Sequence, residues 1–215
     1  MRGTIALFIH HPKCAADSAN GIMQALSPHY RFKILTRYEP EDDFFDDVDM
    51  VAFPGGIGDA DSFDYLLRQN RSHINRFMRN GGRYLGICMG AYWAGHHYFG
   101  YLQGLQAEQY IKRPMTDIRR SFSTTVPVSW QNKPERMFFY DGCALVGDTT
   151  GSEVVATYAN GDPMAVIQGR VGVIGCHPES TPHWFPREKK YLHKHWHQGR
   201  HHKLLLKFVD QLMSK

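Results

Sequence analysis

The sequence lacks any long apolar segment and contains only four cysteines, and both shortages narrow the classes of protein that it can be. The apolar run at residues 4–9 is far shorter than the roughly 18 residues that a membrane span needs, and no signal-peptide cleavage pattern follows it. We therefore expect a cytoplasmic protein that makes no membrane contact. Cys14, Cys88, Cys143 and Cys176 are irregularly spaced without a C-x-x-C pair, so we expect reduced thiols rather than a zinc site or a disulfide framework.

Internal repeats and low-complexity linkers are also missing from the sequence. Its 215 residues fit one ordinary domain, which buries about 70% of the surface that the unfolded chain exposes. A hydrophobic content of 42%, with 13 Phe and 11 Tyr, excludes a disordered, collagen-like or coiled-coil chain. We predict a single folded domain over residues 1–215.

Charge is unevenly distributed, although the net charge is only +4. Residues 39–49 carry seven acidic and no basic residues, which is typical of a solvated loop. Residues 183–215 carry eight Lys and Arg against two acidic residues, with histidines and aromatic residues among them. We expect residues 183–203 to form a basic, histidine-rich surface segment that can meet an anionic ligand or partner.

The first hundred residues alternate short apolar runs with helical segments. Strands are predicted at residues 3–10, 30–36, 50–53 and 83–87, and helices at residues 16–26, 62–67 and 72–79. This alternation is typical of a doubly wound, mostly parallel α/β sheet with helices on both faces.

The second half of the chain is richer in strands. Short strands are predicted at residues 126–130, 137–140, 153–158, 164–168 and 170–176, with turn-forming residues between them. We expect antiparallel hairpins that extend the sheet. Apolar residues at helical spacing predict a final helix at residues 201–213.

Residues 83–95 are typical of a nucleophile elbow, in which a strand meets a helix at a sharp turn. Cys88 lies at the apex, and the small residues Gly86 and Gly90 permit a tight turn. The N-terminus of the following helix would stabilise a thiolate through its free N–H groups and dipole. Cys88 is therefore the candidate nucleophile, and the alternative is a buried core cysteine.

A second motif, His177-Pro178-Glu179, follows the last predicted strand. Thiol catalysis needs a base that takes the proton and a third group that fixes the tautomer of that base. His177 and Glu179 can supply these two functions. The strand at residues 50–53 ends in Pro54-Gly55-Gly56, where glycine lets the backbone aim N–H groups at a ligand. One N–H near Gly55 or Gly56 and another at Met89 would form an oxyanion hole.

These three motifs, in this order, resemble those of the class I glutamine amidotransferase-like superfamily. The closer resemblance is to the domain at the N-terminus of eukaryotic biotin-protein ligases, and it covers roughly residues 5–180. It is carried by the acidic loop with Asp59 and Asp61 after the glycines, by residues 82–92, by a hairpin at residues 138–143, and by residues 154–158 before the His-Pro-Glu motif.

The resemblance implies a flavodoxin-like sheet that carries a Cys-His-Glu triad. Cys88, His177 and Glu179 carry over as the triad, and Gly56 and Met89 as the oxyanion-hole donors. No cofactor or metal is implied. The expected reaction is hydrolysis of an amide through a thioester, with glutamine as the first candidate.

The sequence departs from the glutamine-using members at the substrate pocket. They usually place Gln four residues after the cysteine, where this chain has Tyr92, and an aromatic residue before the His-Pro-Glu motif, where this chain has Cys176. Gly55 and Tyr92 are the candidate substrate contacts. A chain with only the glutaminase-type domain would pass ammonia to a separate synthetase or ligase partner.

Two other functions remain open on the sequence alone. One is action of the triad on a different amide, and the other is a non-catalytic recognition or regulatory module of the biotin-ligase type. A helix over residues 191–202 would place His193, His197 and His201 on one face for a transition metal, but Gly199 interrupts it and no carboxylate or cysteine accompanies them. We expect a surface flap beside the His-Pro-Glu motif instead. No motif supports binding of nucleic acid.

Overall fold

The computed structural model describes residues 2–10, 15–56 and 60–215 and is built on a nine-stranded sheet. Five adjacent strands are parallel and four more extend the sheet in antiparallel order. The parallel strands, in order across the sheet, are β2 (Arg31–Leu35), β1 (Thr4–Phe8), β3 (Met50–Phe53), β4 (Arg83–Ile87) and β11 (Val171–Ile174). The extension consists of β10 (Pro163–Gln168), β9 (Glu153–Tyr158), β6 (Thr124–Trp130) and β7 (Lys133–Phe139).

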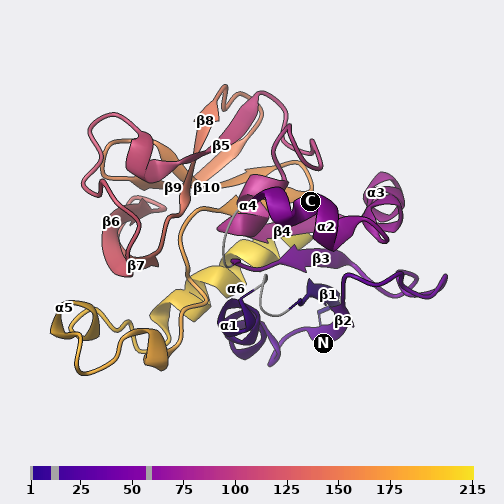
Figure 1. Cartoon of the computed structure of the whole chain (residues 1–215), viewed down its shortest axis with the longest axis horizontal. Helices are drawn as coiled ribbons and strands as arrows, with labels where there is room; N and C mark the ends of the chain where they lie inside the picture. Colours follow the sequence, from indigo (N-terminus) through magenta and orange to yellow (C-terminus); the bar gives the residue numbers. More distant parts are fainter. Residues whose placement is uncertain (1, 11–14, 57–59) are drawn as a thin grey trace.

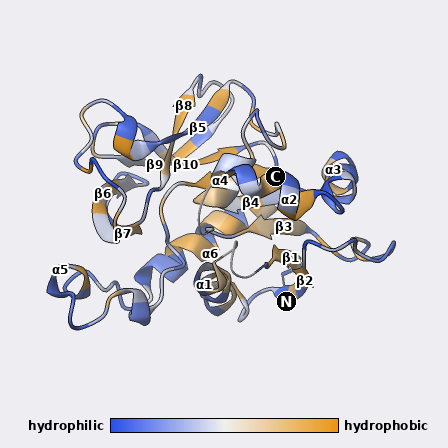
Figure 2. Ribbon diagram, viewed as in Figure 1, coloured by the Kyte–Doolittle hydropathy of each residue, from blue (hydrophilic) through white to orange (hydrophobic). Residues whose placement is uncertain are grey.

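Helices cover both faces of the parallel strands (Figure 1). Alternate residues of a strand point to opposite faces, so Ile5 and Leu7 pack with α1 (Ala16–Leu26) and α6 (Arg200–Met213). Ala6 and Phe8 pack on the other face with α2 (Phe63–Leu67), α3 (Arg71–Arg79) and α4 (Met89–Trp93). The apolar colour in Figure 2 is concentrated on these central strands and on the helix surfaces that face them. The predicted doubly wound α/β fold with an antiparallel extension is confirmed.

Two strands of the structure were not predicted from the sequence. β5 (Leu105–Gln109) and β8 (Cys143–Gly147) form a separate two-stranded antiparallel sheet. The expected hairpin at residues 138–143 is therefore wrong: β7 pairs with β6, while β8 leaves the turn to pair with β5. The pairing of β5 with β8 is between distant segments, which local sequence patterns do not reveal. Short 3-10 helices at Ala60–Ser62, Tyr110–Lys112 and Pro182–Trp184 complete the fold.

The histidine-rich segment is not one helix. It contains α5 (Lys190–His193), and Gly199, in the left-handed region at φ +79°, precedes α6. His193 and His201 therefore do not share a helix face as the metal alternative required, and the described residues hold no group of three potential metal ligands. The segment is exposed only in part, because Leu192, His197 and His201 are buried.

Three neighbouring parallel strands, β3, β4 and β11, end at the same edge of the sheet. Ligand sites of open α/β sheets lie at the carboxyl ends of the strands. Pro54-Gly55-Gly56, Cys88 and His177 follow these three strands, so the topology brings the three sequence motifs together. No helix within the described ranges is long and apolar enough to cross a bilayer.

Candidate functional site

Cys88 occupies a strained turn directly after β4. Its backbone has φ +51° and ψ −105°, in the positive-φ region that residues with a side chain rarely adopt. Strain of this kind persists only where the surrounding structure enforces it. The N–H of Cys88 donates to the carbonyl of Ile174 on β11 at 2.8 Å, which extends the ladder between the two strands and holds the turn in place.

The two glycines beside Cys88 are required by close backbone approach. A Cβ on Gly86 would lie 2.3 Å from the carbonyl oxygen of Gly90, and a Cβ on Gly90 would lie 2.2 Å from that of Phe53. Both distances are far shorter than any van der Waals contact. The chain can turn sharply enough to present Cys88 only because these positions carry no side chain, as the sequence predicted.

The helix after Cys88 is short. α4 spans five residues, Met89–Trp93, so its macrodipole is small compared with that of a longer helix. The N–H of Ala91 in this turn already donates to the Cys88 carbonyl at 2.9 Å, whereas that of Met89, the first residue of the helix, has no carbonyl within the helix to bond to. Stabilisation of a thiolate here would come from these local N–H groups and from neighbouring side chains.

His177 and Glu179 form a buried pair behind the turn. Their side chains are 6% and 0% exposed, and His177 Nδ1 lies 2.8 Å from Glu179 Oε1. A carboxylate only accepts, so Nδ1–H donates and the other ring nitrogen, Nε2, is the one left for Cys88. The second carboxylate oxygen of Glu179, Oε2, has no hydrogen-bond partner among the described residues.

The charge environment of His177 favours its protonated form. Burial acts to lower the pKa of His177, but the charges of Glu179 and Cys88, with hydrogen bonds to both, raise it to about 10. An imidazolium beside a cysteine sulfur stabilises the thiolate. The raised pKa of His177 therefore favours a proton on the imidazole beside Cys88.

Aromatic side chains enclose His177 on its other sides. The rings of Trp184 and Phe138 meet the imidazole edge to face at centroid distances of 5.3 Å and 6.0 Å. The N–H of His177 also donates to the carbonyl of Phe138 at 3.0 Å, so the end of β7 is tied to the His-Pro-Glu motif. This packing restricts the imidazole to one orientation.

A cavity of about 570 Å³ opens on the solvent side of Cys88. Gly56, Met89 and Tyr92, predicted as oxyanion-hole and substrate residues, all line it together with Cys88. Gly55 does not, because its N–H donates to Ser18 and its carbonyl accepts from Ala15. The full lining consists of Gly56, Ala60, Cys88, Met89, Tyr92, Tyr98, Gln109, Ser121, Tyr140 and Asp141.

Several cavity residues were not predicted from the sequence. Gln109 ends β5 and Asp141 lies in the turn between β7 and β8, where the Gln109 amide donates to both carboxylate oxygens at 3.1 and 3.0 Å. The sequence pattern predicted only a turn near Asp141-Gly142. No pattern in the sequence connects this turn with Gln109. Asp141 is the only carboxylate in the lining, which contains no Lys or Arg among the described residues.

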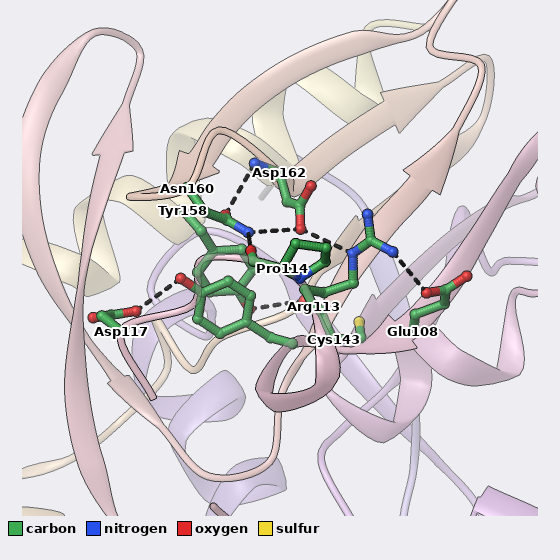
Figure 3. A network of polar contacts seen from close by, with 9 residues as sticks. Glu108, Arg113, Pro114, Asp117, Cys143, Tyr158, Asn160 and Asp162 are labelled. Carbon is green, nitrogen blue, oxygen red and sulfur yellow. Dashed lines mark hydrogen bonds and ion pairs between the residues drawn. The ribbon is translucent and has the colours of Figure 1, made fainter. Parts of the chain in front are cut away.

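A polar network lies on the residues next to Gln109 and Asp141 in the chain (Figure 3). Arg113 donates to Asp162 and to Glu108, each at 3.0 Å, and Asn160 also donates to Asp162 at 2.9 Å. The ring of Tyr158 stacks on that of Tyr110 at 3.7 Å, and its hydroxyl donates to the carbonyl of Cys143 at 2.7 Å. The network fixes the segments on either side of Gln109 and Asp141.

The other cysteines are unlike Cys88. Cys143 and Cys176 are fully buried, and burial raises the pKa of both thiols. Neither lines the cavity. Cys14 and Asp59, which entered the sequence predictions, lie outside the described residues.

Histidines of the basic segment support the backbone of the His-Pro-Glu motif. His202 Nε2 lies 3.2 Å from the carbonyl oxygen of Glu179 and 3.0 Å from that of Ser180, and His197 Nε2 lies 3.2 Å from the latter. Burial, reinforced by neighbouring positive charges, lowers the pKa of His197 and His201 to about 3. These two buried histidines are therefore neutral near pH 7, where they serve hydrogen bonding rather than anion binding.

Comparison with known proteins supports the fold. Residues 11–116 match the family model described as "Biotin-protein ligase, N terminal". A search of curated proteins gives no match. A glutamine amidotransferase from Thermotoga maritima is similar in structure, with a TM-score of 0.69 and 14% identity over 100% of both chains. A protein from Thermoplasma acidophilum, described as a putative GMP synthase subunit, has a TM-score of 0.61 and 12% identity, covering 99% of this chain and 95% of its own.

A third solved structure, PurLQS from Thermotoga maritima, has a TM-score of 0.61 and 18% identity over 90% of this chain and 97% of the other. At such low identities these likenesses establish the fold and leave the chemistry to be argued from the site. The chain therefore shares the fold of these glutamine amidotransferase structures, and over residues 11–116 it is similar to the N-terminal domain family of biotin-protein ligases.

Proposed function

We propose that this protein hydrolyses an amide by thiol catalysis, with glutamine as the first candidate substrate. The observation that carries the proposal is the strained Cys88 between a buried His177–Glu179 pair and an open cavity. A nucleophile at the mouth of a cavity, a base behind it and a carboxylate behind the base are the parts that acyl transfer requires.

The reaction follows from the positions of these groups. Cys88 Sγ, with its proton on His177, forms a bond to the amide carbon. The tetrahedral intermediate collapses, the carbon–nitrogen bond breaks, and His177 gives the proton to the departing ammonia. Water then attacks the thioester, gives its proton to His177 and releases the acid, while Cys88 recovers its proton from His177.

The remaining residues stabilise this sequence of steps. Glu179 accepts from His177 Nδ1, so it holds the ring with Nε2 toward Cys88 and balances the imidazolium charge. Gly56 and Met89 border the cavity beside Cys88, where N–H groups would stabilise the oxyanion.

A second candidate is hydrolysis of an amide other than glutamine. Tyr92 stands where the glutamine-using members commonly have Gln, and its hydroxyl is buried without a partner among the described residues. A ligand group that pairs with this hydroxyl would relieve the cost of leaving it unsatisfied. The non-catalytic recognition module is the third reading, and the experiment below separates all three.

The chain would deliver ammonia to a separate synthetase or ligase. The structural neighbours include a protein described as a putative GMP synthase subunit, and this name marks it as one part of a synthetase. The similarity in fold makes a partner of this kind the first to test. A cytoplasmic location remains a prediction.

The test is covalent trapping with a diazoketone analogue of glutamine, which leaves a permanent adduct even where turnover is slow. We expect one adduct per chain on Cys88, located by peptide mass spectrometry, that excess glutamine suppresses. His177→Ala should slow its formation by about 100-fold or more, because general-base assistance is lost. Cys143→Ala is the matched control and should label at the wild-type rate.

The other outcomes discriminate between the readings. An adduct on Cys88 that glutamine does not suppress, but another small amide does, supports the different-amide reading. If the folded protein, with Cys88 reduced, forms no adduct, the proposed catalysis is contradicted. The non-catalytic recognition module is then the supported function.

A further inference from the structure

Ser18, a residue outside the predicted triad, lies directly against its acid. Ser18 is in the first turn of α1 and is fully buried. Its Oγ lies 2.6 Å from Glu179 Oε1, the same oxygen that accepts from His177 Nδ1. Because a carboxylate only accepts, the Ser18 hydroxyl donates.

The same hydroxyl is held from its other side by the glycine loop. The N–H of Gly55 donates to Ser18 Oγ at 2.9 Å, and the N–H of Ala15 donates to the Gly55 carbonyl at 3.0 Å. A hydroxyl has one proton to give and lone pairs to accept, so these two contacts satisfy Ser18 and direct its only proton at Glu179. Gly55 therefore joins the site through its backbone rather than by contact with a substrate.

The placement of α1 makes this contact specific. A Cβ on Gly21 would lie 2.2 Å from the carbonyl oxygen of Glu179, so the helix approaches the His-Pro-Glu motif as closely as backbone allows. Serine has a lower helix propensity than alanine, and the position is fully buried. Alanine would fit the packing at this position and has the higher helix propensity. The hydroxyl is therefore what serine adds at position 18.

We infer that Ser18 is a positioning residue, which orients the Glu179 carboxylate toward His177 and is itself oriented by the Gly55 N–H. The inference rests on the proposed function, because the orientation matters for catalysis only if His177 acts as the base. Ser18 does not line the cavity, so its effect reaches the reaction through its partners, of which Glu179 is the one that contacts His177. Rotation of an unheld carboxylate would leave Nδ1–H without its acceptor for part of the time.

The test compares Ser18→Ala with Ser18→Thr, which keeps the hydroxyl. We expect Ser18→Ala to slow adduct formation on Cys88 by about 10-fold to 100-fold, as loss of a hydrogen bond to a charged group does. Ser18→Thr should recover most of the rate. Ser129→Ala, on β6 and separated from β11 by β9 and β10, is the matched control and should react as the wild type does.

A double-variant cycle distinguishes positioning from a general structural effect. If Ser18 acts through Glu179, Ser18→Ala should have little further effect in a Glu179→Gln background, where the carboxylate is already lost. Additive losses in the cycle would overturn the inference. This comparison remains decisive if Ser18→Thr fails to fold.

A spectroscopic readout keeps the two proposals separate. The Nδ1 proton of His177, hydrogen-bonded to a carboxylate, should give a low-field proton NMR signal that shifts or broadens in Ser18→Ala. If the wild type forms no adduct, the proposed function fails while this signal still tests the positioning of Glu179. An unmoved signal together with a wild-type adduct rate in Ser18→Ala would refute the inference.

Discussion

The two sides of Cys88 differ in how their polar groups are connected, although Glu179 Oε2 on the buried side has no partner among the described residues. On the buried side, Ser18, His177 and Glu179 form a connected set of hydrogen bonds of 2.6–2.9 Å that continues to the Gly55 backbone. On the open side, the Tyr92 hydroxyl has no partner among the described residues, and Tyr140 is 51% exposed. The buried side is therefore pre-organised for the proposed chemistry, whereas the open side leaves a tyrosine hydroxyl unpaired among the described residues.

The two sides differ because different elements of the fold supply their residues. The buried side is supplied by β3, β4 and β11, three adjacent parallel strands whose ends must converge, and by the first turn of α1. The open side is supplied in part by α4, which carries Met89 and Tyr92, and in part by Gln109 at the end of β5 and by loop residues such as Asp141. A fold can therefore keep the reactive group fixed while loop residues alter what enters the cavity.

The largest effect should come from the reactive atom itself. Cys88→Ala should abolish turnover of any substrate, by roughly 10⁶-fold as for removal of a hydrolase nucleophile. Before mutation, a small alkylating agent near neutral pH should label Cys88 ahead of Cys143 and Cys176, because burial raises the pKa of the latter two. Peptide mass spectrometry measures the order.

Labelling of Cys143 or Cys176 before Cys88 would break the distinction between a reactive and a core thiol. The peptide with Cys14 provides a further comparison.

A smaller loss of turnover is expected when Cys88 is kept and only the group that orients His177 is changed. Glu179→Gln keeps the shape of the side chain but loses the charge, and turnover should fall by roughly 10⁴-fold, less than for Cys88→Ala. Steady-state ammonia release on wild type and both variants, at matched folded fractions, provides the measurement. Equal losses in the two variants would contradict separate roles for Cys88 and Glu179.

The buried pair also predicts a pH dependence of stability. The pKa of His177 is raised in the folded protein from an ordinary 6.5 to about 10, so between these values the folded state binds more protons than the unfolded state. The resulting stability is fully present below about pH 6.5 and is lost as the pH rises toward 10.

Urea unfolding of the wild type and His177→Gln from pH 6 to pH 10 measures this effect. The wild type should lose stability more steeply with rising pH than the variant does, whatever their absolute stabilities. Parallel pH profiles would show that His177 does not carry the raised pKa.

The sequence predicted the triad and the cavity residues Gly56, Met89 and Tyr92, but it missed residues on both sides of Cys88. Cys88, His177 and Glu179 each follow a strand with a strong local pattern, and the alternation of strands and helices required those strands to be adjacent. Ser18 carries no such pattern, because a serine in a helix is common and its partner is distant in sequence. Gln109 and Asp141 depend on the pairing of β5 with β8, which no local periodicity indicated.

The burial of the basic segment was missed for a related reason. Composition distinguishes a charged stretch from an apolar one, but it does not show which histidines face inward. His197 and His201 are buried because they pack beside the His-Pro-Glu motif and beside Glu135, and each makes hydrogen bonds there.

The smallest expected effect concerns Tyr92 and tests the open side. Tyr92→Phe removes a buried hydroxyl that lacks a partner among the described residues, so the free energy of unfolding should stay constant or rise by up to about 1 kcal/mol. If the hydroxyl contacts the substrate, the concentration of amide needed to protect Cys88 from the diazoketone should rise by about 3-fold to 10-fold.

Tyr92→Gln introduces the residue that glutamine-using members commonly have at this position. It should lower the glutamine concentration that protects Cys88. Thermal unfolding and protection curves on the three proteins measure both quantities. A marked loss of stability in Tyr92→Phe would mean that the hydroxyl is already paired within the protein, and the contrast between a connected buried side and an unpaired Tyr92 on the open side would then fail.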